Sequence, residues 1–363
     1  MYVNNGKISS RQTFRLYVFD LMGIGTLLLP PYLAKLCGCD GIWAIIAGSV
    51  LGAIYLFYLG WIMKKMNQDM CSFLRKSKGK VARTLTLGLV GIHSVLTAGF
   101  CVYVFSKLMC QSLIQEASFE LVAIVLIVVA IYAVYGGIEC RARVYEVLFW
   151  FVLIPYVAMM LASIRDFEIT YWESFGGTDG RSLAEGIYLV FLLITPVFFS
   201  LFLIGEKEKN YGTNMRKTVF GALVVTSVIL LGSYVLLVGN FGEKGLAALQ
   251  FPVVTLMSTI QFQGNFLKRM DALMVAVWFF TLYALLNLHL HYGVQMIKEL
   301  WGEKKQRNRI GIVIMGGVVF GIAYGMKYQD RLIYVFLDYY SYVAVPLMIV
   351  GPAVLLIGRR KGV

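Results

Sequence analysis

The amino-acid sequence predicts an all-α integral membrane protein with ten transmembrane helices, and three observations lead to this fold class. The chain of 363 residues is 59% hydrophobic and only 15% charged, whereas soluble globular proteins are about 45–50% apolar and about 25% charged. It contains ten apolar runs of about 18 residues or more, the length that crosses a bilayer as a helix. Its Lys and Arg residues divide unevenly between the two sides of the expected membrane.

The ten predicted spans follow one another along the whole chain. They cover residues 12–36, 41–63, 84–110, 119–136, 143–164, 184–204, 217–239, 271–297, 309–326 and 333–357. A further apolar run, residues 251–262, contains Pro252 and is too short to cross a bilayer. We expect a re-entrant or interfacial helix there. Residues 1–363 are therefore treated as one transmembrane, transporter-like domain.

Basic residues set the expected orientation of these helices. The chain carries 33 Lys and Arg against 20 Asp and Glu, a formal net charge of +13. When the connections are assigned to alternate sides of the membrane, 24 of the 33 basic residues fall on one side. The other nine are Lys35, Lys107, Arg165, Arg181, Lys244, Lys268, Arg269, Lys327 and Arg331. Because cytoplasmic loops carry the excess of Lys and Arg, we expect both termini in the cytoplasm. Topology then accounts for the positive charge, so the expected partner is a lipid bilayer and not nucleic acid.

The sequence shows no motif of an enzyme or of a cofactor site. It lacks a Walker loop, a dinucleotide fingerprint, a zinc-protease motif and a nucleophile elbow. Cys37 and Cys39 stand one residue apart, but Asp40 is the only other ligand-type side chain beside them. We therefore expect no metal, no cofactor and no enzymatic activity.

Helix 1 contains the segment Asp20-Leu-Met-Gly23-Ile24-Gly25-Thr26. Two glycines partway across the membrane tolerate a break in the helix. An unwound segment would free backbone N–H groups and a half-helix N-terminus, which form a ready site for a carboxylate or another anion. The alternative is close packing against a neighbouring helix, because small residues are common where membrane helices meet.

Helix 6 contains Thr195-Pro196 near its middle, followed by Phe198 and Phe199. Proline removes one backbone hydrogen bond, so we expect a bend there, although a single proline kink is ordinary in membrane helices. Ten helices divide into a first repeat of about residues 8–164 and a second of about residues 184–357. An odd number of helices in each half inverts the second half, which makes helix 6 the counterpart of helix 1.

Three ionisable side chains lie at a similar depth in the predicted spans. Asp20, His93 and His289 each stand roughly 12 Å from the cytoplasmic end of their helix, at 1.5 Å of rise per residue. A carboxylate inside a membrane is expected to be paired, protonated or in contact with water. Asp20 with His93 or His289 is therefore a candidate proton-coupling pair, and a satisfied buried polar contact is the alternative.

Four stretches together resemble one known family. They are Ile8-Ser9-x-x-Gln12 leading to Gly25 and Pro30; Gly137-Ile-Glu139-x-x-Ala142-Arg143-x-x-Glu146; Phe251-Pro252 with Phe266-x-x-Arg269-x-Asp271 and Trp278; and, more loosely, Asp40-Gly-Ile-Trp43. This pattern is similar to the B subunits of spore germinant receptors, the GerAB-type endospore germination permeases of the amino acid–polyamine–organocation transporter superfamily. The resemblance covers essentially the whole chain.

The resemblance implies a LeuT-like 5+5 inverted repeat with discontinuous helices 1 and 6. It also implies that a small, amino-acid-like nutrient binds near the membrane midplane between helices 1, 3, 6 and 8. Mapped onto this chain, the ligand-binding residues are Asp20, Gly23, Ile24, Gly25, Thr26, Ala98, Cys101, Val102, Thr195, Pro196, Phe198, Phe199, Tyr283 and Asn287. The resemblance implies that a ligand carboxylate meets the backbone N–H groups of Gly25 and Thr26, and that a ligand amine meets backbone carbonyls or Asp20. Asp20 departs from the uncharged residue that family members often have in that neighbourhood.

Two further groups of charged residues stand at opposite ends of the predicted helices. Glu139, Arg143 and Glu146 lie at the inner foot of helix 5, and Arg269 and Asp271 lie at the outer entry to helix 8. Either group is a candidate gate. Structural pairing and helix capping are the alternatives.

The resemblance implies a nutrient-sensing subunit that signals to partner A and C subunits in the inner membrane of a spore. The alternative is a proton- or sodium-coupled amino acid transporter, because the same fold serves both tasks.

Overall fold

The protein is described by a computed structural model that covers residues 8–66, 70–76, 80–112, 114, 116–172, 174–203, 215–259, 270–301, 305–328 and 337–359. The long helices are α1 (Ser10–Cys37), α2 (Gly41–Met66), α4 (Lys80–Ser112), α5 (Phe119–Tyr135), α6 (Gly137–Ala162), α7 (Gly180–Ile194), α9 (Met215–Ala248), α11 (Met270–Trp301), α12 (Lys305–Met326) and α14 (Val345–Arg359). The short ones are η1 (Gly38–Asp40), α3 (Met70–Lys76), η2 (Ser163–Asp166), η3 (Ile169–Trp172), η4 (Thr195–Phe199), α8 (Ser200–Leu203), α10 (Pro252–Thr259) and the π-helical η7 (Tyr340–Ala344).

The all-helical fold class is confirmed. Within the described residues, each of the ten predicted spans coincides with helical structure, and α10 is the short helix expected at residues 251–262. Six helical stretches are long and apolar enough to cross a membrane, and one of them, Ser10–Met66, contains two of the predicted spans. Boundaries differ by a few residues. The difference that matters is at α6, which begins at Gly137 and not at residue 143.

The N-terminus of α1 explains one of the sequence motifs. Ser9 is the N-cap, and its hydroxyl accepts a hydrogen bond from the backbone N–H of Gln12 at 3.2 Å. The Gln12 side chain in turn accepts from the backbone N–H of Ser9 at 2.9 Å. This reciprocal capping box satisfies two helix-end donors that have no partner within the helix.

The expected break in helix 1 is wrong. α1 is α-helical without interruption from Ser10 to Cys37, so Gly23 and Gly25 lie inside a regular helix. Gly23 serves close packing, because a Cβ atom there would stand 3.0 Å from the backbone carbonyl of Thr281 in α11. The glycines would tolerate a break in the helix, but the close packing of Gly23 against α11 is made by a continuous helix.

The expected interruption of the sixth predicted span, residues 184–204, is confirmed. α7 ends at Ile194, the segment Thr195–Phe199 is a 3₁₀ helix, and α8 resumes at Ser200. Pro196 stands at the start of the 3₁₀ segment, where its missing N–H disturbs the ladder least.

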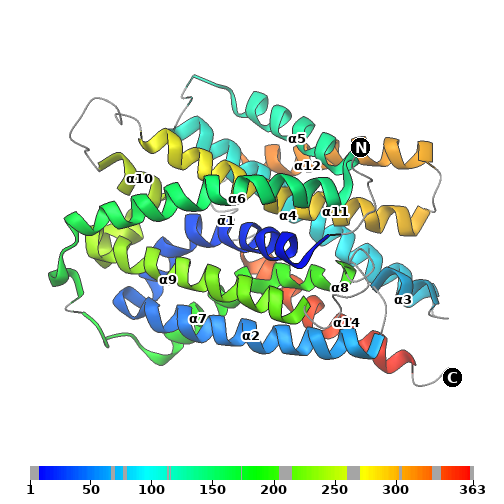
Figure 1. Ribbon diagram of the computed structural model, residues 1–363, viewed down its shortest axis with the longest axis horizontal. Helices are drawn as coiled ribbons and strands as arrows, with labels where there is room; N and C mark the ends of the chain where they lie inside the picture. Colours follow the sequence, from blue (N-terminus) through cyan, green and yellow to red (C-terminus); the bar gives the residue numbers. More distant parts are fainter. Residues whose placement is uncertain are drawn as a thin grey trace.

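Figure 1 shows the long helices running roughly side by side along the long axis of the molecule. The start of α1, the end of α14 and α3 lie toward the right-hand end, and α10 lies at the left-hand end. The first and the last described helices therefore begin and end toward the same end of the bundle.

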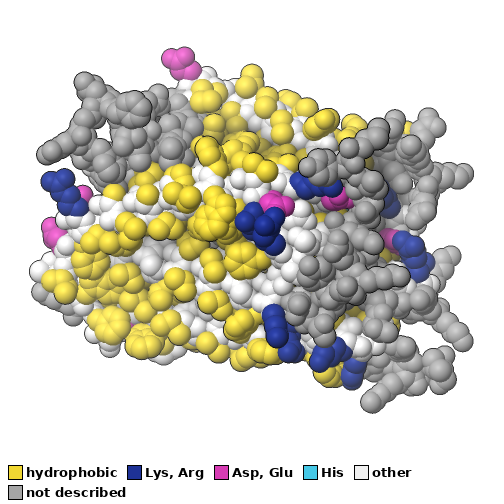
Figure 2. All heavy atoms as spheres, in the orientation of Figure 1, with side chains coloured by type: hydrophobic (Ala, Val, Ile, Leu, Met, Phe, Trp, Pro, Cys, Tyr) yellow, Lys and Arg dark blue, Asp and Glu magenta, His cyan; other side chains and the backbone are white. Residues whose placement is uncertain are grey.

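Large apolar side chains stand exposed around the outside of the bundle, among them Ile54, Val128, Val147, Ile154 and Val313. In Figure 2 such side chains cover the middle of the visible face, and most of the Lys and Arg side chains shown lie toward the right-hand end. An apolar belt with charge gathered at one end is what a lipid-facing surface requires.

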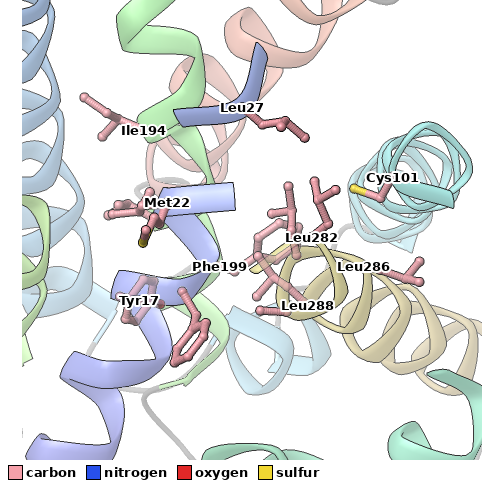
Figure 3. Close-up of a cluster of buried hydrophobic side chains, with 14 of the residues drawn as sticks. Tyr17, Met22, Leu27, Cys101, Ile194, Phe199, Leu282, Leu286 and Leu288 are labelled. Atoms are coloured by element: carbon pink, nitrogen blue, oxygen red, sulfur yellow. The ribbon is translucent and has the colours of Figure 1, made fainter. Parts of the chain in front are cut away.

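The interior is packed around α1, which contacts α6, α7, α9 and α11. Figure 3 shows Tyr17, Met22 and Leu27 of α1 lying on one side of the α11 side chains Leu282 and Leu286, with α4 on the other. α4 in turn packs along α11. α1 is thus the central helix, and most side chains in its middle are buried, whereas Arg11 and Lys35 near its ends are exposed.

Candidate functional site

A cavity of about 60 Å³ lies against the middle of α1. Its walls come from α1, α4, α7, η4, α11 and the segment from Leu337 to Tyr340. Most lining side chains are aliphatic, and leucines of α1, α7 and α11 predominate. A mainly apolar cavity with a few convergent polar groups is typical of a small-molecule site.

The polar groups of this cavity come from four different elements. They are the carboxyl group of Asp20 and the hydroxyl of Tyr32 in α1, the hydroxyl of Thr97 in α4, the imidazole of His289 in α11 and the hydroxyl of Tyr340 in η7. The Tyr340 hydroxyl is hydrogen-bonded to that of Thr195, with 2.8 Å between the oxygens. That bond joins η7 to η4, the 3₁₀ segment between α7 and α8.

Asp20 forms a buried ion pair with Arg141 of α6. Arg141 Nη2 donates to Asp20 Oδ1, and it also donates to the carbonyl oxygen of Ala284 in α11 at 3.0 Å. The side chains of both charged residues are almost completely buried, at 0% and 4% exposure. The pair therefore ties α1, α6 and α11 together beside the cavity, and removing one partner would leave an uncompensated buried charge.

The sequence analysis missed Arg141 as the partner of Asp20. Because the predicted fifth span began at residue 143, Arg141 was assigned to the cytoplasmic connection. The positive φ of 72° at Gly137 marks the point where the chain turns directly into α6. Since α6 begins there, Arg141 lies inside the bundle. The pattern Gly136-Gly137 ahead of Arg141 was the available signal.

The two histidines of the candidate proton site lie against each other. The ring centroids of His93 and His289 are 5.4 Å apart. His93 Nδ1 stands 3.3 Å from the hydroxyl of Tyr339, and Phe199 packs edge-on to His289 with centroids 5.2 Å apart. His289 and Asp20 both line the cavity, while the ion pair of Asp20 is with Arg141.

Five of the residues expected at the site lie on the described wall of the cavity: Asp20, Ile24, Gly25, Pro196 and His289. Thr97 and Tyr340 also line it and were missed by the sequence analysis. Thr97 is the immediate neighbour of the expected Ala98, so the cavity is bordered by the expected helix but by a different face of it. Tyr340 had no signal of its own, because the π-helical turn that presents it is invisible to a hydropathy pattern.

The other expected ligand residues serve packing or structural hydrogen bonds. Gly23, Ala98, Cys101, Val102, Phe198 and Phe199 are buried among helices. The Thr26 hydroxyl donates to the carbonyl of Met22 and accepts from Trp278 Nε1. The Tyr283 hydroxyl donates to the carbonyl of Val129 at 3.1 Å, and Asn287 is 3% exposed. None of these belongs to the described lining of the central cavity.

A wider cavity of about 540 Å³ adjoins the central one on the side where α1 ends. Lys35 of α1, Lys107 and Gln111 of α4 and the segment 247–250 line it. Leu28 and Tyr32 line both cavities. The two side chains thus stand between the central cavity and a wider, more polar space at this end of the bundle.

The charged residues at the other end of the bundle are paired. Glu139 accepts from Arg143 one helical turn away. Glu146 binds Arg11 and Gln12 of α1, with Arg15 3.7 Å away. These contacts fasten the start of α1 to α6. Arg269 lies outside the described residues, and so does the side chain of Asp271.

Asp40 holds together the ends of α1 and α7 that lie near the wider cavity. Its carboxylate accepts from the backbone N–H groups of Gly176 at 2.8 Å and Thr178 at 3.0 Å. Burial by itself raises the pKa of Asp40, but these two donors and the Thr178 hydroxyl outweigh it and keep the pKa below its ordinary value. The motif Asp40-Gly-Ile-Trp43 thus has a structural role at the α1–α2 junction.

Comparisons with known proteins agree with this geometry. A family model described as "Spore germination protein" matches residues 7–332. The chain is 22% identical to "Spore germination protein YndE" of Bacillus subtilis (strain 168) over 100% of this chain and 99% of that protein. It is 20% identical to "Spore germination protein A2" of the same organism over 92% of each chain.

Two solved transporter structures share the fold. A Na⁺-coupled sialic acid symporter matches with a TM-score of 0.69 and 10% identity over 97% of this chain and 79% of that one. Mhp1, a nucleobase-cation-symport-1 family transporter, matches with a TM-score of 0.73 and 13% identity over 98% and 80%. The chain is therefore a multi-pass membrane protein with a LeuT-like fold.

Proposed function

This chain belongs to the spore germination protein family, and from that membership we propose that it is the nutrient-sensing subunit of a spore germinant receptor. The nutrient is an amino-acid-like small molecule, and it binds in the central cavity beside Asp20. The observation that carries the proposal is this cavity, where a largely aliphatic wall encloses a few buried polar groups from α1, α4, α11 and η7.

The elements around the cavity supply a means of passing the signal on. The cavity is lined by Pro196 at the interruption of helix 6 and by Tyr340 in a π-helical turn. Interrupted segments have fewer regular backbone hydrogen bonds to break than a complete helix, and such irregularities gather at functional sites. A ligand that binds one arrangement of these segments better than another shifts the population toward it.

The proposal includes the place and partners of the protein. We expect it in the inner membrane of the spore with both termini cytoplasmic, beside the A and C subunits of the receptor. The 24-to-nine division of the basic residues supports that orientation.

A proton- or sodium-coupled amino acid transporter is the second candidate function. Asp20 and His289 on the cavity wall, with His93 against His289, support a proton-coupled version of it. Uptake of radiolabelled amino acids into proteoliposomes that contain this protein alone would favour the transporter. Ligand binding without uptake would favour the sensor.

Germination of spores tests the proposal. Spores lacking the gene are complemented with wild type, Gly25→Leu or Gly317→Leu and exposed to amino acids, sugars and bile acids. Gly25 borders the cavity, so leucine there fills it, whereas a side chain at the exposed Gly317 meets nothing within 4 Å. We expect loss of the response to one nutrient, restored by Gly317→Leu and not by Gly25→Leu at equal protein level. An unchanged response in the gene-deficient spores would contradict the sensing role.

A further inference from the structure

We propose that the central cavity recognises its ligand through a primary ammonium group on a short aliphatic body, and that a carboxylate on the ligand is dispensable. This inference rests on the proposed function, because it assigns the ligand chemistry of the same cavity. The cavity offers unpartnered hydrogen-bond acceptors, and their number and kind limit which ligand head group can bind there.

Three hydrogen-bond acceptors on the cavity wall have no partner within the described part of the protein. They are Oδ2 of Asp20, the hydroxyl oxygen of Thr97 and the imidazole of His289. Their residues are 2%, 2% and 0% exposed. Buried polar groups in folded proteins are nearly always hydrogen-bonded, so three of them on one cavity wall point to a ligand with matching donors.

A primary ammonium group has three N–H donors and no acceptor. A carboxylate oxygen, a hydroxyl oxygen and the bare nitrogen of a neutral imidazole each accept one such donor. The three groups arise from α1, α4 and α11, so they approach the cavity from separate helices. The three acceptors equal in number the three N–H donors of an ammonium head, and the remaining N–H of the His289 ring is left without a partner among the described residues.

The ion pair with Arg141 leaves Asp20 suited to this task. Arg141 occupies Oδ1 and is itself held by the carbonyl of Ala284. Arg141 thereby orients the carboxyl group, while Oδ2 has no hydrogen-bond partner among the described residues. A hydrogen bond from a charged donor to a charged acceptor is among the strongest in proteins.

The cavity lining itself offers few donors to a ligand carboxylate, and the nearest unpartnered ones are Nε and Nη1 of Arg141 behind Asp20. Among the described residues that line the cavity there is no Lys or Arg. Because α1 is α-helical through Gly25 and Thr26, the backbone N–H groups there are engaged in the helix and do not form an anion site. A carboxylate close to Asp20 Oδ2 would also meet a like charge.

The rest of the wall selects an aliphatic body. Leu21, Leu28, Leu189, Leu193 and Leu285 surround the polar groups. A hydrocarbon tail removed from water against these side chains is stabilised in proportion to its buried area. The small volume of the cavity, about 60 Å³, limits this hydrocarbon tail to a short one.

Four probes that share the 3-methylbutyl group separate head-group chemistry from the tail. They are isoamylamine, L-leucine, 4-methylpentanoate and isoamyl alcohol, each titrated calorimetrically into the purified full-length protein in lipid nanodiscs. We expect isoamylamine to bind at least about tenfold more tightly than the acid or the alcohol, and within about tenfold of L-leucine. Absent isoamylamine binding, or equally tight binding of the acid or alcohol, would overturn the inference.

Variants separate the recognition of the head group from protein folding. Asp20→Asn leaves Arg141 unpaired and is expected to unfold the protein, so Thr97→Val is the informative change because it keeps shape and charge. We expect it to weaken isoamylamine binding about tenfold or more, while Thr84→Val, at an exposed position of the same helix, leaves binding unchanged. Unchanged affinity in Thr97→Val would contradict the role given to its hydroxyl.

The outcomes distinguish this inference from the proposed function. If L-leucine binds and isoamylamine does not, the cavity remains the nutrient site, but the inference that a ligand carboxylate is dispensable fails. If isoamylamine binds to wild type and Gly25→Leu spores still germinate normally, the amine site stands and the sensing role fails.

Discussion

The two counterpart helices of the inverted repeat are built differently. α1 is an unbroken helix of 28 residues with two glycines in its middle, whereas the sixth span is divided into α7, the 3₁₀ segment η4 and α8 around Pro196. Glycine weakens a helix by about 1 kcal/mol but keeps every hydrogen bond, and proline removes one outright. Both residue types permit a break without compelling one, because α1 also runs unbroken through Pro30 and Pro31.

Because they are built differently, we expect α1 and the interrupted sixth span to play different roles at the cavity. α1 is held on several sides, by the Asp20–Arg141 pair, by the contact of Gly23 with α11 and by Glu146 at its start. η4 contacts the cavity through Pro196 and is joined to η7 through the bond between Thr195 and Tyr340. We expect α1 to act as the fixed wall of the cavity and η4 with η7 as the wall that adapts to a ligand.

The largest expected effect comes from breaking the ion pair that fixes α1. Arg141→Gln leaves Asp20 as an isolated buried charge, and we expect a loss of about 3–5 kcal/mol in the free energy of unfolding. Thermal unfolding of the purified protein, monitored by intrinsic Trp fluorescence, measures it. The double variant Asp20→Asn/Arg141→Gln removes both charges and is expected to recover most of that loss. Equal instability of the double variant would show that the pair does not act through charge.

The next effect separates the two glycines of α1. A Cβ atom at Gly23 would press on the Thr281 backbone at 3.0 Å, whereas at Gly25 it would meet Leu193 Cδ1 at an ordinary 3.7 Å. We expect Gly23→Ala to destabilise the protein by about 1–3 kcal/mol through overpacking. Gly25→Ala should stay within about 1 kcal/mol of wild type. Equal unfolding temperatures for the two variants would contradict the tight packing of Gly23 on α11.

A smaller effect is expected at the interruption of helix 6. Pro196→Ala supplies the missing N–H and favours a continuous helix, so we expect unchanged or slightly higher stability, by about 1 kcal/mol. Ligand affinity should fall, because η4 would leave its position on the cavity wall. Calorimetry with isoamylamine and a thermal melt on the same sample give both quantities. Unaltered affinity would mean that the interruption does not shape the site.

The smallest effect concerns the junction between the end of α1 and the start of α7, which Asp40 holds together. The pKa of Asp40 is lowered in the folded protein from its ordinary value of 3.8, so its hydrogen bonds stabilise the fold above that pH and are lost as the pH falls below it. We expect Asp40→Asn to lose about 0.5 kcal/mol at neutral pH, with a smaller difference from wild type at pH 3. Urea titrations at the two pH values measure this, and Asp179→Asn is the matched control, since Asn serves equally well as a helix N-cap.

Hydropathy was sufficient to place the helices, because a bilayer allows few alternatives to a long apolar helix. The same pattern also yielded the interruption at Pro196, whose chemistry is local. It failed for Gly23 and Gly25, where the outcome depends on what α11 places opposite them. Backbone continuity at glycine is decided by tertiary packing, which a single sequence does not contain.

Only part of the residues around the cavity could be predicted from the sequence, because the others depend on how neighbouring helices are placed and rotated. Asp20 stood out as a carboxylate in an apolar helix, but finding Arg141 required the true start of α6. Thr97 required the rotation of α4, and Tyr340 required the π-helical turn. An error of one residue in register moves a side chain by about 100° around a helix, which separates a lining residue from a packing one.

The central claim is that the nutrient binds in the cavity beside Asp20. It is tested most directly by calorimetric titration of the nutrient that the spore assay identifies into purified wild type, Gly25→Leu and Gly317→Leu. We predict that wild type and Gly317→Leu bind equally and that Gly25→Leu binds at least about a hundredfold more weakly, because its side chain occupies the cavity. Binding to a folded Gly25→Leu protein with the affinity of wild type would contradict the account.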